Sequence, residues 1–153
     1  MEITLTQKER TLLEDAKSHE EICIKKYGNY ANQTNDSELK QLCKTNEQME
    51  RNHLNTINQL LSGTIPDMNQ QQNQNYAQNS VSTQLEGNAV LDKDICSDLL
   101  MTEKYVSGVY DTSIFEFKDS QVRNILNHIQ KEEQKHGEDI FKYMESKGMY
   151  NAQ

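Results

Sequence analysis

Residues 120–147 read SQVRNILNHIQKEEQKHGEDIFKYMESK, and their apolar side chains recur every three or four positions. The recurring positions are Val122, Ile125, Ile129, Ile140 and Tyr143. This spacing predicts one helix with a single buried face. Glu133 and His136 lie three residues apart on that same face, in the gap between Ile129 and Ile140. A carboxylate and an imidazole inside a buried face need a chemical explanation, because an unpaired buried charge costs several kcal/mol.

The same apolar spacing predicts three more helices upstream. They span about residues 8–34, 37–62 and 91–117, and residues 120–147 form the fourth. The pattern breaks at NQTNDSE, residues 32–38, and at FEFKDSQ, residues 115–121. The pairs Asp36-Ser37 and Asp119-Ser120 lie inside these breaks and are candidate helix N-caps, because a short polar side chain can accept hydrogen bonds from the first free amides of a helix. The prediction is an all-α protein.

A polar segment joins the two predicted helical hairpins, which span about residues 8–62 and 91–147. It contains Pro66, the only proline, and a tract at residues 69–79 in which nine of eleven residues are Asn or Gln. Such a tract has no apolar stripe, so it predicts a hydrated crossover over about residues 64–90 or, alternatively, a segment that mediates assembly. A connection of this length is expected where the second hairpin of a four-helix bundle starts at the opposite end from the first, because the chain must then cross the full length of the bundle.

Composition limits the classes of protein to consider. The 153 residues are 34% hydrophobic with a formal net charge of −8, which predicts one slender helical domain over residues 1–153 and does not favour nucleic acid as a partner. No apolar run is long enough to span a membrane, and the first residues do not resemble a signal peptide. Cys23, Cys43 and Cys96 form no paired pattern, so we expect buried free thiols in a reducing compartment. Limited core makes a homodimer plausible.

The two hairpins are related by an offset of 83 residues without a gap. The offset superposes Glu20 on Glu103, Tyr27 on Tyr110, Glu50 on Glu133, and His53 on His136. These polar residues lie where the apolar stripe of each helix should continue. The pattern predicts an internal repeat that places four carboxylates and two imidazoles inside the protein.

Their heights along each hairpin also match. Glu20 and Glu50 each lie fifteen residues from a turn at residue 35, and Glu103 and Glu133 each lie fifteen residues from residue 118. At a rise of 1.5 Å per residue, the members of each pair meet about 22 Å from their turn. If the hairpins pack in register, all six side chains converge.

This set of residues predicts a site for two divalent metal ions. The predicted ligands are Glu20, Glu50, His53, Glu103, Glu133 and His136. One Glu from each of two helices and Glu-x-x-His from each of the other two form the ligand set of di-iron and di-manganese bundles. Mixed oxygen and imidazole ligands suit iron or manganese. The alternative is a metal-free cluster that shares protons through hydrogen bonds.

Residues beside the predicted ligands have two possible roles. Tyr27 and Tyr110 follow Glu20 and Glu103 by two helical turns, so they either donate hydrogen bonds to ligand carboxylates or serve as core aromatics. His19 and His128 are unmatched in the other hairpin and are expected at the surface or its boundary. Glu47 and Glu132 are expected to be exposed or to lie just outside the ligands.

The paired Glu-x6-Tyr and Glu-x-x-His pattern resembles rubrerythrin-type proteins of the ferritin-like superfamily. The stretch DLLMTEKYVSGVYDTSIFEFKDSQVRNILNHIQKEEQKHGEDIFKYMESKGMY, residues 98–150, is similar to the coat F domain of spore coat proteins. The first resemblance implies an up-down-down-up bundle. The second implies synthesis in the cytoplasm of the mother cell, deposition on the spore coat and other coat proteins as partners.

Two functions follow from these observations. The first is a spore coat or sporulation-associated protein whose bundle carries a di-iron or di-manganese centre. The second is a di-metal oxidoreductase that acts on peroxide or O₂, with catalase-, peroxidase- or ferroxidase-like chemistry. Ligands alone leave the reaction open, because one fold and one ligand set support several chemistries.

Overall fold

The computed structural model describes residues 1–69 and 88–151, and this part of the chain is helical. Its helices are α1 (Gln7–Gln33), α2 (Ser37–Leu61), α3 (Ala89–Glu116) and α4 (Ser120–Ser146). These bounds agree with the predicted bounds to within two residues. Extended pairing in the described residues is limited to an isolated bridge between Glu2 and Thr64. The all-α prediction is confirmed for these residues, whereas most of the predicted crossover lies outside them.

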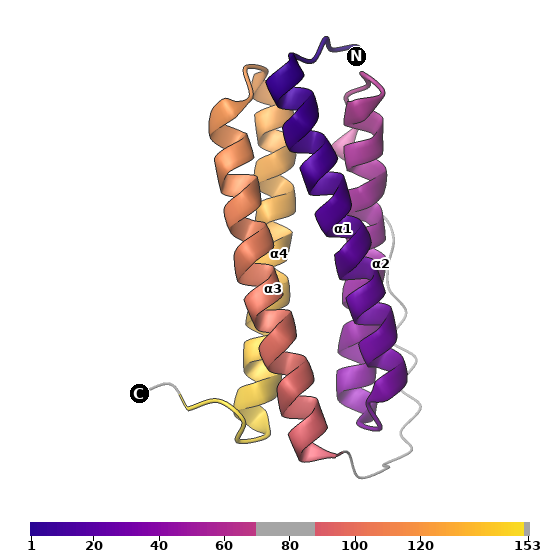
Figure 1. The fold of residues 1–153 in the computed structure, drawn as a ribbon, viewed down its shortest axis with the longest axis vertical. Coiled ribbons are helices and arrows are strands. Elements are labelled where there is room, and N and C mark those ends of the chain that lie inside the picture. The colour runs from indigo at the N-terminus through magenta and orange to yellow at the C-terminus, as the bar shows by residue number, and fades with distance from the viewer. Residues whose placement is uncertain (70–87, 152–153) are drawn as a thin grey trace.

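The four helices lie side by side as a bundle (Figure 1). In this view α1 runs downward and α2 returns, while α3 runs upward and α4 descends. Besides its hairpin partner α2, α1 packs against α3, and α4 packs against α3 and α2. The end of α2 and the start of α3 therefore lie at opposite ends of the bundle.

Both predicted N-caps form. The Asp36 carboxylate accepts a hydrogen bond from the backbone amide of Leu39 at 2.9 Å. The Asp119 carboxylate accepts from the amides of Gln121 and Val122 at 2.8 and 3.1 Å. Each cap satisfies amides that the first turn leaves without an intrahelical partner, so α2 and α4 start at fixed residues.

Two buried acids tie the hairpins to each other at opposite ends of the bundle. Glu9, in the first turn of α1, accepts a hydrogen bond from the backbone amide of Lys118 at 3.1 Å, in the turn between α3 and α4. Asp92, in the first turn of α3, accepts from the Thr34 hydroxyl at 2.7 Å, in the turn between α1 and α2. Glu9 and Asp92 are themselves 83 residues apart. These contacts fix how far one hairpin can slide along the other.

The buried apolar side chains form two clusters, one toward each end of the bundle. Helices α2, α3 and α4 each contribute side chains to both clusters. In each of these helices a polar segment lies between the two contributions. Cys23, Cys43 and Cys96 are buried free thiols within these clusters. The polar layer between the clusters contains the predicted metal ligands.

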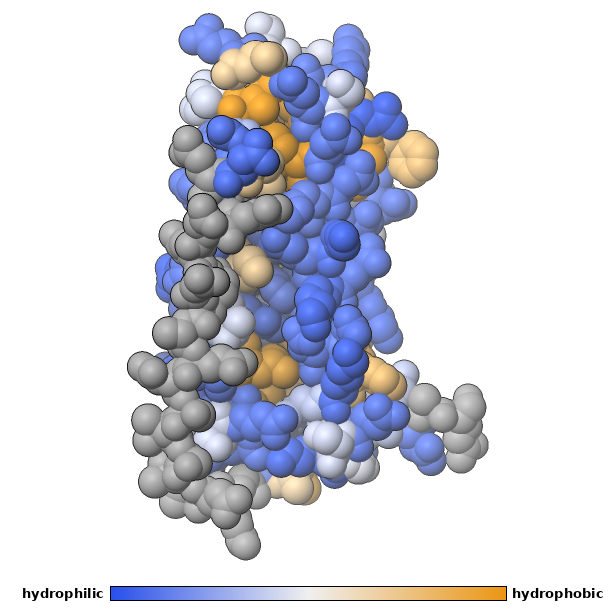
Figure 2. All heavy atoms as spheres, turned by 180° about the vertical axis from the view of Figure 1, so that it is seen from behind, coloured by the Kyte–Doolittle hydropathy of each residue, from blue (hydrophilic) through white to orange (hydrophobic). Residues whose placement is uncertain are grey.

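The face of α2 and α4 is mostly hydrophilic along its middle, with apolar side chains toward its ends (Figure 2). Among the described residues, no helix combines the length and the apolar character that a membrane crossing requires.

Candidate metal centre

All six predicted ligands meet in the polar layer of the bundle. Their exposed fractions are 0% for Glu20, Glu50 and Glu133, and 3% for Glu103, His53 and His136. One comes from α1, one from α3, and two each from α2 and α4. Helical geometry explains the pairs on α2 and α4, because residues i and i+3 project from one face. In the structure the two hairpins pack in register, as the convergence of all six side chains requires.

The histidines reach across the bundle to the opposite hairpin. Nδ1 of His53 lies 3.0 Å from a carboxylate oxygen of Glu133, and Nδ1 of His136 lies 2.9 Å from one of Glu50. The two imidazole rings are stacked with centroids 6.0 Å apart. Both histidines thus present the same ring nitrogen to the carboxylates.

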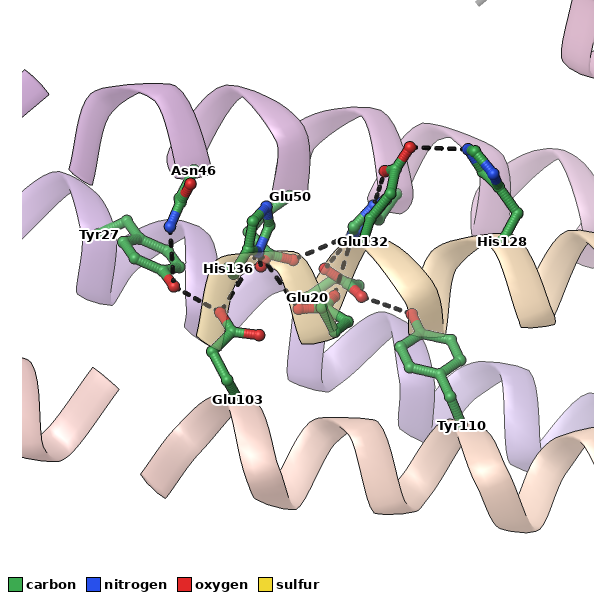
Figure 3. A network of polar contacts seen from close by, with 11 residues as sticks. Glu20, Tyr27, Asn46, Glu50, Glu103, Tyr110, His128, Glu132 and His136 are labelled. Carbon is green, nitrogen blue, oxygen red and sulfur yellow. Dashed lines mark hydrogen bonds and ion pairs between the residues drawn. The ribbon is translucent and has the colours of Figure 1, made fainter. Parts of the chain in front are cut away.

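The tyrosines also cross between the hairpins. The Tyr27 hydroxyl donates a hydrogen bond to Glu103 at 2.5 Å, and the Tyr110 hydroxyl donates to Glu20 at 2.5 Å (Figure 3). Both rings are fully buried, so each tyrosine is a core aromatic and a donor to a predicted ligand at once. The side-chain amide of Asn46 adds a contact of 3.4 Å to the Tyr27 hydroxyl.

The ligand atoms form two overlapping groups that could each hold an ion. One group is Glu20, Glu50, His53 and Glu133, and the other is Glu50, Glu103, Glu133 and His136. Within each group the ligand atoms lie within 4.8 Å of one another. Glu50 and Glu133 belong to both groups, which is the arrangement that bridging carboxylates require.

Three buried carboxylate oxygens support this fit. Oε2 of Glu20, Glu103 and Glu133 accepts no hydrogen bond from the described residues. A buried acceptor without a donor is costly, and most such atoms in proteins are satisfied by protein, water or an ion. The residues present therefore fit a pair of divalent cations in donor type, number and free coordination sites.

Burial perturbs the protonation of the carboxylates. Burial and then the charge of Glu20 raise the pKa of Glu50 to about 7. Burial and the adjacent Glu133 raise the pKa of Glu103 to about 8. Without a cation, these two carboxyl groups tend to keep their protons, because burial and the neighbouring negative charges disfavour full ionisation.

The imidazoles respond in the opposite sense to burial. Burial alone lowers the pKa of His53, but hydrogen bonds to Glu132 and Glu133 outweigh it and place this pKa well above its ordinary value. For His136, burial likewise lowers the pKa, and contacts with Glu103, Glu133 and Glu50 raise it well above the ordinary value. Contacts with the carboxylates thus favour the protonated form of both imidazoles.

Residues outside the predicted ligand set also contact the cluster, and the sequence did not specify these contacts. Nε2 of His53 lies 2.5 Å from Glu132, whose other oxygen lies 2.7 Å from Nε2 of His128. The expectation that Glu132 lies just outside the ligands agrees with this position, but its contact with a histidine was not foreseen. The internal repeat could not indicate these contacts or the contact made by Asn46, because none of the three residues has a counterpart of the same type in the other hairpin. His19 and Glu47 pack elsewhere: His19 lies edge-on to Tyr105, and Glu47 pairs with Arg51.

Part of the chain is similar to a known protein family. Residues 91–153 match the Coat F domain. The match covers α3 and α4, confirms the resemblance seen over residues 98–150 and supports an association with the spore coat. No curated protein and no solved structure matched the chain. The residues matched to the Coat F domain therefore include Glu103, Glu133 and His136, whereas the other predicted ligands lie outside them.

Proposed function

We propose that this protein is a spore-coat-associated, ferritin-like protein that holds a carboxylate-bridged di-iron or di-manganese centre in its bundle. The observation that carries the proposal is that Glu50 and Glu133 belong to both groups of ligand atoms. Each of these carboxylates can offer one oxygen to each ion. Glu20 with His53 and Glu103 with His136 then complete the two positions.

Charge favours occupancy of both positions. Four ionised carboxylates carry four negative charges, and two divalent ions balance them. Binding would remove the need for the protons that Glu50 and Glu103 otherwise retain. Oxygen and imidazole donors together favour iron or manganese over thiolate-seeking metals.

The proposed ferritin-like repeat is supported by contacts at matched positions. The pairs Tyr27–Glu103 and Tyr110–Glu20 are related by the 83-residue offset. The tether acids Glu9 and Asp92 are related by it too, although their donors, the Lys118 amide and the Thr34 hydroxyl, do not occupy matched positions. Antiparallel hairpins whose joining ends lie at opposite ends of the bundle are the arrangement expected of an up-down-down-up topology.

For its cellular context we propose synthesis in the cytoplasm of the mother cell and assembly with other spore coat proteins. The Coat F domain match supports the coat association. A homodimer stays a prediction, which light scattering of the purified chain would measure.

Metal analysis of the purified chain tests the proposal. After growth with manganese or iron, we expect about two ions per chain, and none or far fewer in Glu133→Ala. Glu138→Ala is the matched control, because Glu138 lies on the same helix with its side chain 50% exposed. A chain that stays metal-free at saturating manganese and ferrous iron would instead favour the proton-sharing cluster.

A second candidate function is an oxidoreductase that acts on peroxide or O₂. It is favoured by a groove of about 290 Å³ between α1 and α3, whose lining includes Cys23 and Val106. These two side chains lie one helical turn after Glu20 and Glu103, so a single layer separates the groove from the carboxylates. Bound iron or manganese would supply the redox chemistry, and Glu20 and Glu103 are the carboxylates contributed by the two helices that line the groove.

Peroxide consumption and ferrous oxidation by the metal-loaded chain test this second candidate. Val106→Phe would fill the groove floor and is expected to slow either reaction while leaving the metal content at two ions. Loaded protein that performs neither reaction faster than buffer would exclude the oxidoreductase and leave the coat-associated metal protein.

A further inference from the structure

The cluster is symmetric in its ligands but not in the groups behind its two imidazoles. Nδ1 of both His53 and His136 faces the glutamates. His53 also uses its second ring nitrogen, because Nε2 lies 2.5 Å from Oε2 of Glu132. In the part of the chain that the structure describes, every carboxylate ion pair of His136 is made through Nδ1.

Glu132 is itself held in place. Its Oε1 lies 2.7 Å from Nε2 of His128, one turn earlier on α4. The exposed fraction of the side chain falls from 39% at His128 to 23% at Glu132 and 3% at His53. Both oxygens of Glu132 are thus engaged, and His128, Glu132 and His53 form a continuous chain from the surface of α4 to the ligand cluster. Figure 3 shows the first contact of this chain, between His128 and Glu132.

The other hairpin has no equivalent chain. At the 83-residue offset, Glu132 corresponds to Met49 and His128 corresponds to Thr45. Neither methionine nor threonine offers a carboxylate to an imidazole. The difference between the two halves is therefore a property of the sequence.

We infer that Glu132 is a positioning residue that makes the two metal positions unequal, with the ion at Glu20 and His53 held more tightly than the ion at Glu103 and His136. The inference rests on the proposed di-metal centre. A carboxylate that accepts the Nε2 proton fixes the imidazole tautomer, leaves the Nδ1 lone pair for the ion and increases its basicity. Removing such a partner typically lowers metal affinity about 10- to 100-fold.

Titration of the metal-free chain with Mn²⁺, in competition with a chelator of known affinity, tests the inference. The wild type is expected to bind two ions in two steps whose affinities differ by about 10- to 100-fold. Glu132→Met, which copies the other hairpin, is expected to retain two ions but to weaken the tighter step until the two steps merge.

Three further variants separate positioning from general effects. Glu47→Met removes the same charge from a side chain of matched burial, 24% exposed against 23%, and should leave both steps unchanged. Glu132→Gln keeps an oxygen that can accept the Nε2 proton, so it should restore part of the difference. His128→Thr should reduce the difference by a smaller factor, and with Glu132→Gln it carries the test if Glu132→Met does not fold.

Two results would overturn the inference while leaving the di-metal proposal intact. One is two equal steps in the wild type, and the other is an unchanged pair of steps in Glu132→Met. A wild-type chain that binds no Mn²⁺ and no ferrous iron would instead refute the di-metal proposal, and the inference with it.

Discussion

The Tyr27 hydroxyl donates a hydrogen bond to Glu103, a glutamate of the other hairpin, at a donor–acceptor distance of 2.5 Å. The matching bond from Tyr110 to Glu20 has the same length and the same cross-hairpin course. Each tyrosine therefore orients a predicted ligand from the opposite half of the chain. Packing of the two hairpins is therefore what brings each tyrosine to its glutamate.

Tyr27→Phe is predicted to destabilise the metal-free protein by about 1–3 kcal/mol, because a buried oxygen of Glu103 loses its donor. Metal affinity should fall about tenfold or more, as is typical for loss of a group that orients a ligand. Urea denaturation and chelator competition measure the two effects. Tyr143→Phe is the control, since Tyr143 packs in an apolar cluster outside the ligand set. Equal effects of the two substitutions would contradict an orienting role for Tyr27.

The metal-free chain is predicted to lose stability as the pH rises. The pKa values of Glu50 and Glu103 are raised to about 7 and about 8 in the folded protein, and those of the two buried histidines are also raised. A group with a raised folded pKa contributes stability at low pH and loses it as pH rises through that value. The glutamate contributions should therefore decline from about pH 5 to pH 8, and the histidine contributions above pH 6.5.

Thermal melts of the metal-free chain between pH 5 and pH 9 measure this dependence. Glu103→Gln imitates the protonated acid, so its melting temperature should vary less with pH and exceed that of the wild type at pH 8. A wild-type melting temperature that is constant or rises across this range would contradict the protonation pattern of the cluster.

Metal loading is predicted to stabilise the fold. A ligand present at one hundred times its dissociation constant adds about 2.7 kcal/mol. Manganese should therefore raise the melting temperature of the wild type and of Glu138→Ala, but not that of Glu133→Ala. A chelator should reverse the increase. An equal increase in Glu133→Ala would indicate that manganese binds elsewhere.

The two end tethers are predicted to contribute separately. Glu9→Ala and Asp92→Ala should each cost about 1–3 kcal/mol, because each removes a partner from a buried polar group. Their effects should add in the double variant, since the two residues lie at opposite ends of the bundle. Glu14→Ala, an exposed substitution on α1, is the control. Strong non-additivity in urea denaturation would show that the ends are coupled.

Much of this architecture could be predicted from the sequence because its signals are local. Apolar spacing and the caps at Asp36 and Asp119 located the helices to within two residues. The repeat of Glu-x-x-His predicted which side chains meet, because helical spacing fixes a face and distance from a turn fixes a height.

Contacts between helices with no sequence repeat could not be predicted in this way. The partner of Tyr27 depends on which helix of the other hairpin packs against α1, and apolar spacing does not specify that helix. Glu132 was expected to be exposed or to lie just outside the predicted ligands, and nothing in its local pattern indicated a histidine from α2 nearby. The tethers at Glu9 and Asp92 were likewise hidden, because they join residues that are distant in the chain.

Those tethers have a consequence for the order of events in the life of the protein. They close the bundle at its top and bottom through neutral donors and need no cation. The helical scaffold can therefore form without the proposed ions, and the polar layer between the apolar clusters would bind them afterwards. Under the proposed function, subunits already assembled in a coat layer would then take up their ions from the surroundings of the maturing spore.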